Sequence, residues 1–258
     1  MNKSLMAVPI ILVIVACKPL SESPLCDETQ RAINDANFYI LTHLVPFKGD
    51  VQTVRIIESP DNISTVINFA QCGRLETFER ESKSSTSTEA KTLRNKARWQ
   101  KGKGWVTEWI RLTRSASGKM SKLIMTERYD TDKLGRIISS SGVITGIESP
   151  RAMSSIVYSY NDQHQMVSRM IRGGMIASLS FNYNYKGKYL TRISTSDSTS
   201  TLHWDEQGRW LSSETQTDYS GKRESRCLAW DRRGNCVDEF GESQSKTERV
   251  SYKFTYYQ

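Results

Sequence analysis

The sequence contains no apolar run long enough to cross a lipid bilayer as a helix. The run at its start, from Leu5 to Ala16, falls short of the about 20 residues that a spanning helix requires. There is no Gly-x-Ser-x-Gly motif, and no glycine-rich phosphate loop follows a predicted strand. The 3 histidines are scattered, and no two cysteines have the short spacing of zinc ligands. We therefore expect a non-enzymatic protein with no metal and no cofactor.

The start of the chain has the pattern of an export signal. Lys3 precedes the apolar run, and the small residue Ala16 ends it. The sequence Ile14-Val15-Ala16-Cys17 resembles the lipobox of bacterial lipoproteins. The resemblance implies cleavage before Cys17, a diacylglycerol on its sulfur and an acylated amine, which together form a stable membrane anchor. Lys18 follows in place of the Asp that resembles an inner-membrane retention signal, so we expect the periplasmic face of the outer membrane.

These features divide the chain into a signal peptide (1–16), a lipidated tether (17–25) and one domain (26–258). The net charge is +8. An exported basic protein meets anionic lipids and glycolipids rather than genomic nucleic acid, although general solubility explains the charge equally well. The expected partners are the membrane, through the lipid on Cys17, and an anionic glycolipid or an envelope protein.

Four further cysteines suit an oxidising compartment: Cys26, Cys72, Cys227 and Cys236. They allow three pairings, of which Cys26–Cys72 with Cys227–Cys236 is the simplest. If Gly234 closes a regular turn, Cys236 lies opposite Trp230, and Cys227 then points to the other face of the sheet. The second disulfide therefore requires an irregular strand or a wider loop.

Periodicity predicts one short helix followed by strands. Asp27 is a candidate N-cap, and apolar residues recur at helical spacing up to a stop before Pro46. From Phe47 onward the apolar residues alternate, which is typical of strands. Residues 80–96 are polar with hardly any aliphatic side chain, and we predict a mobile loop there.

A short unit with an aromatic residue, a turn and an apolar residue recurs along the chain. Asp or Asn in such a unit caps backbone N–H groups, and Gly supplies the positive φ that closes a hairpin. The last four units begin 23, 21 and 26 residues apart, which is typical of repeated supersecondary structure. The units are FAQCGRL at Phe69, YDTDKLGRI at Tyr129, YNDQHQMV at Tyr160, YNYKGKYL at Tyr183, WDEQGRWL at Trp204 and WDRRGNCV at Trp230.

These units resemble degenerate YD repeats, the Tyr-Asp…Gly-Arg units of bacterial Rhs-type proteins. Together with the lipobox, the segment FKGDVQTV, the hairpin CLAWDRRGNCVDE and the tail ERVSYKFTYYQ, they resemble the YnfC-type lipoproteins of enteric bacteria. Cys26 departs from that pattern. We expect a mainly β fold, in which an antiparallel meander of YD-like hairpins forms a curved sheet or a partly open barrel after a short N-terminal helix.

Two alternatives for function remain open beside a binding or envelope-structural module. The first is a periplasmic hydrolase of envelope glycans, which needs two carboxylates in one cleft. Its candidate residues are Asp130, Asp205, Asp231 and Glu239, whereas turn capping already explains the three aspartates. The second is a module that adds an exposed strand edge to another sheet.

One segment combines basic and aromatic residues in a way that suits an anionic glycolipid or lipid headgroup. A solvated loop leading into a strand explains the same residues. They are Lys91, Arg94, Lys96, Arg98, Trp99, Lys101, Lys103 and Trp105.

Overall fold

The computed structural model describes residues 26–101, 104–146, 150–173, 178–219, 221–244 and 246–257. The predicted signal peptide, Cys17, the tether and Lys103 lie outside these residues. Within the described ranges, one α-helix, α1 (Glu28–Thr42), precedes 17 strands that belong to one antiparallel sheet. No helix in this part of the chain is long and apolar enough to cross a bilayer.

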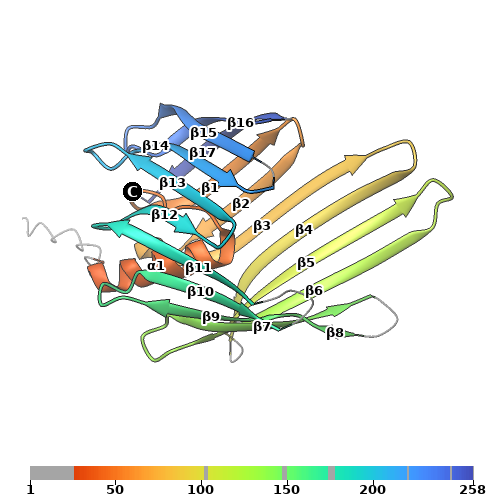
Figure 1. Ribbon diagram of the computed structural model, residues 1–258, viewed down its shortest axis with the longest axis horizontal. Helices are drawn as coiled ribbons and strands as arrows, with labels where there is room; N and C mark the ends of the chain where they lie inside the picture. The colour runs from red at the N-terminus through yellow and green to blue at the C-terminus, as the bar shows by residue number, and fades with distance from the viewer. Residues whose placement is uncertain are drawn as a thin grey trace, which may run out of the picture.

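The strands follow one another as a meander (Figure 1). Their bounds are β1 (Val51–Ser59), β2 (Ile63–Phe69), β3 (Leu75–Ser85), β4 (Glu89–Gln100), β5 (Gly104–Ser115), β6 (Met120–Thr131), β7 (Ile137–Thr145), β8 (Arg151–Ala152), β9 (Ser155–Tyr160), β10 (Met166–Arg172), β11 (Leu179–Lys186), β12 (Tyr189–Ser194), β13 (Ser198–Trp204), β14 (Trp210–Thr217), β15 (Gly221–Trp230), β16 (Cys236–Ser243) and β17 (Thr247–Tyr256).

The sheet closes into a barrel because its first and last strands pair. β1 and β17 lie side by side in antiparallel register, with Val54 opposite Phe254, and β7 pairs with both β8 and β9. The described strands other than β8 therefore form a closed ring of 16. The predicted mainly β meander with a short N-terminal helix is confirmed, and its curved sheet is fully closed.

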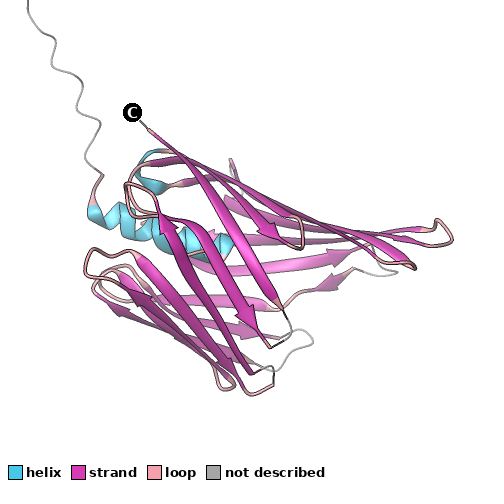
Figure 2. Cartoon of the chain, turned by 90° about the horizontal axis from the view of Figure 1, so that it is seen from above, coloured by secondary structure: helices cyan, strands magenta, loops and turns pink. Residues whose placement is uncertain are grey.

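Helix α1 plugs one end of the barrel (Figure 2). Asp27 is its N-cap, as predicted, and the Asp27 side chain accepts a hydrogen bond from the Thr29 N–H at 3.0 Å. Phe38, Ile40 and Leu41 are at most 4% exposed, and they pack against inward side chains of strands all around the ring. A helix with such an apolar stripe is stable only where strands cover it, so the lumen at this end is a packed core.

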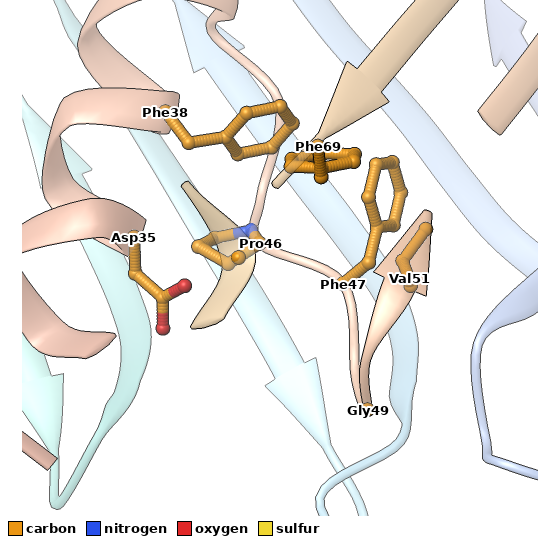
Figure 3. Close-up of a pocket in the computed structure, with 8 residues that line it drawn as sticks. Asp35, Phe38, Pro46, Phe47, Gly49, Val51 and Phe69 are labelled. Carbon is orange, nitrogen blue, oxygen red and sulfur yellow. The ribbon is translucent and has the colours of Figure 1, made fainter. Parts of the chain in front are cut away.

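The chain after α1 completes the plug. The rings of Phe38, Phe47 and Phe69 form one aromatic cluster with centroid distances of 5.3–6.3 Å (Figure 3). Beside it, Asp35 and Pro46 border a hollow of only about 10 Å³. This end of the barrel has room for about one water molecule at that point.

Four hairpins at the plugged end share one five-residue turn, which is the structure behind the repeated unit. In each, the N–H of the first residue donates to the carbonyl of the fifth at 2.9–3.0 Å, and the first side chain accepts from backbone N–H groups of the same turn. The fourth residue has positive φ, and in one turn it is His164 instead of glycine. The turns are 132–136, 161–165, 205–209 and 231–235.

Turn capping by Asp205 and Asp231 is confirmed. In two other units, however, the turn differs from the one that the repeated pattern predicts. In YDTDKLGRI the capping residue is Asp132, because the hairpin turns two residues later than the Tyr-Asp pair suggests. Asp130 lies in β6 and accepts a hydrogen bond from Ser139 at 2.8 Å. In YNYKGKYL the chain reverses in a tighter turn between Lys186 and Tyr189.

The predicted mobile loop at residues 80–96 is wrong. These residues form the ends of β3 and β4, which pair from Thr77–Arg98 to Ser85–Ala90. Beyond the core both faces of this hairpin meet solvent, so no apolar alternation is required and cross-strand pairs stabilise it instead.

The four cysteines form two disulfides in the simplest of the three possible pairings. Cys26–Cys72 ties the start of α1 to the turn between β2 and β3, with a Cα–Cα distance of 5.4 Å. Cys227–Cys236 lies across the β15–β16 hairpin, with a Cα–Cα distance of 5.8 Å. Cys236 is opposite Trp230, as predicted, and β15 is irregular on both sides of Ala229, which brings Cys227 to the same face.

Candidate functional site

Side chains of α1 and of the following segment bind the plug to the rim turns. The Asn37 side chain donates to the Gly135 carbonyl at 2.8 Å and accepts from the Ile137 N–H at 2.9 Å. Asn235 makes the equivalent pair of bonds with the backbone of Lys48, at 2.6 and 2.9 Å. The turns of the repeated unit thus present backbone groups and one amide side chain that fix the plug.

The outer wall of the barrel is charged on β3, β4 and β14–β17, whereas on β9 and β10 it exposes Val157 and Met170. Glu79 and Glu81 alternate with the core residue Phe78 on β3, so they point outward. On β4, Lys96 and Arg94 form ion pairs with them at 2.9 and 2.6 Å. Further outward pairs are Arg98–Glu108 at 3.1 Å, Lys222–Glu214 at 3.3 Å and Arg249–Asp238 at 2.5 Å.

The hairpins β3–β4 and β5–β6 extend beyond the open end of the ring (Figure 1). The register of β2 with β3 ends at Ser64–Glu81, so the rest of β3 has no partner on that side within the described sheet. We call residues 82–95 and 109–125 the wing. Its tip lies opposite the plugged end, because each strand of the meander reverses direction at every turn.

The inner face of the wing carries three rows of side chains, which alternate with the outward positions. Odd-numbered positions of β4, β5 and β6 point inward, because the core residues Ala97, Trp105 and Tyr129 belong to the same series. From the tip toward the lumen, the rows are Lys91–Thr113–Ser121, Leu93–Arg111–Leu123 and Asn95–Trp109–Met125.

This face is amphipathic and hollowed. Leu93 is 43% exposed and Trp109 is 39% exposed. Nearer the tip, Lys91, Arg111 and Ser121 border a hollow of about 370 Å³. Lys91 pairs with Glu89, whereas no described residue forms a salt bridge or hydrogen bond with the Arg111 side chain.

Deeper in the lumen, the inward carboxylates are held by hydroxyl or guanidinium groups. Glu127 accepts from Tyr129 at 2.8 Å and from Ser140 at 2.6 Å. Glu239 accepts from Tyr252 at 2.6 Å, and burial raises the pKa of Glu239 despite that bond. Both oxygens of Glu127 are thus occupied by protein hydroxyls.

On one side of the lumen an acidic and a basic group face each other. Glu58 accepts from Arg80 at 2.9 Å. Burial raises the pKa of Glu58, and Arg80 opposes that effect. Elsewhere in the lumen, the Arg169 guanidinium lies 3.9 Å from the centroid of the Phe181 ring, and its buried Nε has no hydrogen-bond partner in the described structure.

The residues of the predicted basic and aromatic segment do not form one surface. Arg94, Lys96 and Arg98 point outward and are paired with acids, as described above. Trp105 is buried in the core, and Trp99 contacts its ring edge to face at 5.7 Å near the plugged rim. Lys101 is exposed in the β4–β5 turn. Lys91 alone belongs to the inner face of the wing.

The four carboxylates proposed for a hydrolase do not converge. Asp205 and Asp231 cap separate rim turns, Asp130 points outward from β6, and Glu239 faces the lumen. The histidines are also apart: His43 ends α1, His164 lies in a rim turn and His203 is exposed on β13. No group of three metal-ligating side chains is found in the described ranges.

The inner face of the wing could not be predicted from the sequence, because its residues come from three different strands. Trp109 and Arg111 alternate with the partly exposed apolar residues Ile110 and Leu112, so no single run of letters marks them. The signal available in the sequence was the period of two, which assigns Lys91 and Arg94 to opposite faces.

No protein-family model matches the chain, and a search among curated proteins found no match. Among solved structures, the chain is similar to a porin-like protein from Bacteroides uniformis ATCC 8492, with 10% sequence identity and a TM-score of 0.51. The similarity covers 81% of this chain and 99% of that one. At this identity the likeness concerns the fold alone, which in both proteins is a β-barrel of similar chain path.

Proposed function

We propose that this chain is an outer-membrane lipoprotein whose barrel lies in the aqueous periplasm as a non-enzymatic binding module. The lipid on Cys17 is its membrane attachment. We also propose that the chain is related to the YnfC-type lipoproteins with YD-like units. The four similar rim turns support a repeated unit of this kind.

The outer wall carries this proposal. A barrel that crosses a membrane presents an apolar band to lipid, and a Lys or Arg there costs about 2–4 kcal/mol at the bilayer midplane. Here the outward positions of β3, β4 and β14–β17 carry charged pairs such as Lys96–Glu79 and Lys222–Glu214. Such a wall favours water, so an anchor outside the barrel is required to hold the protein at a membrane.

The plug argues against a channel through the barrel. Phe38 fills the lumen at one end, and Asn37 and the Cys26–Cys72 disulfide hold the helix in place. The binding role therefore belongs to the open end of the barrel.

The same disulfide sets the orientation of the proposed anchor. Residues 17–25 extend to about 30 Å at most, and Cys26 is fixed at the plugged rim. The plugged end therefore faces the anchoring membrane, and the wing faces away from it.

A hydrolase is the weaker candidate. Its four proposed carboxylates lie at separate places, and the lumen carboxylates Glu127 and Glu239 are engaged by Tyr129, Ser140 and Tyr252. A binding module needs no such pair.

Fractionation of cells that express the native chain or Cys17→Ser tests the proposal. We expect the native protein in the outer membrane, with the mass of an acylated chain, and the variant in the soluble periplasmic fraction. An integral membrane pool of Cys17→Ser that resists alkaline extraction would show that the wall itself lies in lipid. A native chain without acyl mass would remove the anchor.

A further inference from the structure

We infer that the inner face of the wing binds a single anionic amphiphile, with its phosphate-type head at Arg111 and Lys91 and its hydrocarbon on Leu93 and Trp109. This inference deepens the proposed binding role by naming a ligand class, and its choice of a dispersed occupant rests on the proposed anchor at the plugged end.

The head site lies in the hollow near the wing tip. Three basic residues border it together with one carboxylate, Glu89, so the hollow has an excess of positive charge; they are Lys91, Arg111 and Lys122. Arg111 has no partner in the described structure, and a guanidinium binds phosphate or carboxylate oxygens through two parallel hydrogen bonds. The hydroxyls of Thr113 and Ser121 border the same hollow and supply further donors.

The tail site lies next to it, toward the lumen. Leu93 and Leu123 flank Arg111 in one row, and Trp109 and Met125 occupy the row below. Leu93 and Trp109 remain 43% and 39% exposed although they face the concave side of the sheet. On the outer face, Arg94 shares a row with Ile110 and Ile124 and is paired with Glu81, whereas Arg111 on the inner face has no partner in the described structure.

The size and the position of the site select one occupant. A hollow of about 370 Å³ is within the range of small-molecule sites. The tether begins at the plugged end, so the wing is remote from the anchoring membrane, and we commit to dispersed amphiphile molecules rather than a bilayer surface. An added peptide strand would pair with the edge of β3, where Lys83 opposes such pairing.

Calorimetry on the full chain carrying Cys17→Ser tests the inference, with decyl phosphate below its micelle concentration as the probe. Inorganic phosphate supplies the head alone, and decyl maltoside supplies the same tail with an uncharged head. We expect decyl phosphate to bind at least about tenfold more tightly than either, because each lacks one of the two contacts.

Two matched variants locate the site. Arg111→Gln removes the inner guanidinium and is expected to weaken decyl phosphate binding by about tenfold or more. Arg114→Gln removes the same charge from the outer face of the same strand and is expected to leave binding within about twofold. Both side chains are exposed, and circular dichroism verifies that each variant is folded.

Equal weakening by both variants would overturn the inference, because it would indicate general charge attraction. Equal binding of inorganic phosphate or of decyl maltoside would also overturn it, as would binding to phosphatidylglycerol vesicles without binding to decyl phosphate. None of these results bears on the anchor, which the fractionation tests separately.

Discussion

Asp35 offers the sharpest test of the plug, because its half-buried carboxylate has no hydrogen bond or ion pair in the described structure. Burial raises its pKa from the ordinary 3.8 to about 7, although Arg31 on the same helix and Lys188 in the β11–β12 turn lower it. Tyr185 of β11 also lies within electrostatic range of it. We expect Asp35→Asn to stabilise the barrel by an amount that grows as the pH rises from about 4 to 7.

The sign follows from proton linkage. Below pH 3.8 the Asp35 carboxyl is protonated in both the folded and the unfolded chain and imposes no penalty. As the pH rises toward 7, the unfolded chain loses the proton while the folded chain keeps it, so the folded state becomes progressively less favourable. A shift of about 3 pKa units corresponds to at most about 4 kcal/mol, and the penalty is complete above pH 7.

The assay is urea denaturation of the native sequence and Asp35→Asn between pH 4 and pH 8. The difference in the free energy of unfolding should grow by about 2–4 kcal/mol over that range. Burial also lowers the pKa of His43, to about 4, but His43 is present in both proteins and its titration cancels in the difference. Glu28→Gln, at an exposed position of the same helix, is the control. A difference that stays flat, or an Asp35→Asn variant that is less stable at pH 8, would refute the reasoning.

Four further variants concern the plug and the rim, and thermal or urea unfolding checks the prediction for each of them. Replacing Cys26 and Cys72 by serine opens a loop of 46 residues and should cost about 4 kcal/mol; a cost below about 1 kcal/mol would mean that noncovalent contacts alone hold the plug. Asn37→Ala leaves two rim backbone groups without partners and should cost about 2 kcal/mol. His164→Gly should gain up to about 1 kcal/mol because φ is 59° there, whereas Gly208→Ala should lose at least about 1 kcal/mol because φ is 69° and the new Cβ would lie 1.9 Å from the Tyr189 hydroxyl oxygen.

Local chemistry made part of this fold predictable. Asp27 at the start of α1 and the aspartates at 205 and 231 act on backbone groups within four residues of themselves, so the sequence next to them contains the whole interaction. The register of Cys236 opposite Trp230 followed from one turn glycine for the same reason.

Long-range pairing could not be predicted in this way. Closure of the ring depends on β1 meeting β17, with Val54 opposite Phe254, and no local pattern relates two segments at opposite ends of the chain. The prediction of a loop at residues 80–96 was wrong for a different reason. An alternation of apolar and polar residues marks a strand only where one face is buried, and both faces of the wing meet solvent.

The candidate site shows the same limit. The run of basic residues from Lys91 to Arg98 looked like one surface, but a strand sends neighbouring side chains to opposite faces. Arg94 therefore pairs with Glu81 on the outer wall, whereas Lys91 borders the hollow on the inner face. Arg111 joins Lys91 there only through the pairing of β4 with β5, which the sequence does not state.

The likeness to a porin-like barrel and the proposed role in water are compatible, because strand path and surface chemistry are set by different residues. An antiparallel meander closes into a barrel through its turns and through the backbone hydrogen bonds between neighbouring strands. Both can form whether the outer wall faces water or lipid. The side chains that point outward from each strand determine whether the wall favours water or lipid. In this chain the apolar half, with Phe78 and Ile67, points into the lumen, and outward positions carry ion pairs such as Lys96–Glu79. A membrane-spanning barrel has the reverse arrangement, so the wall, and not the chain path, supports the proposed role in water.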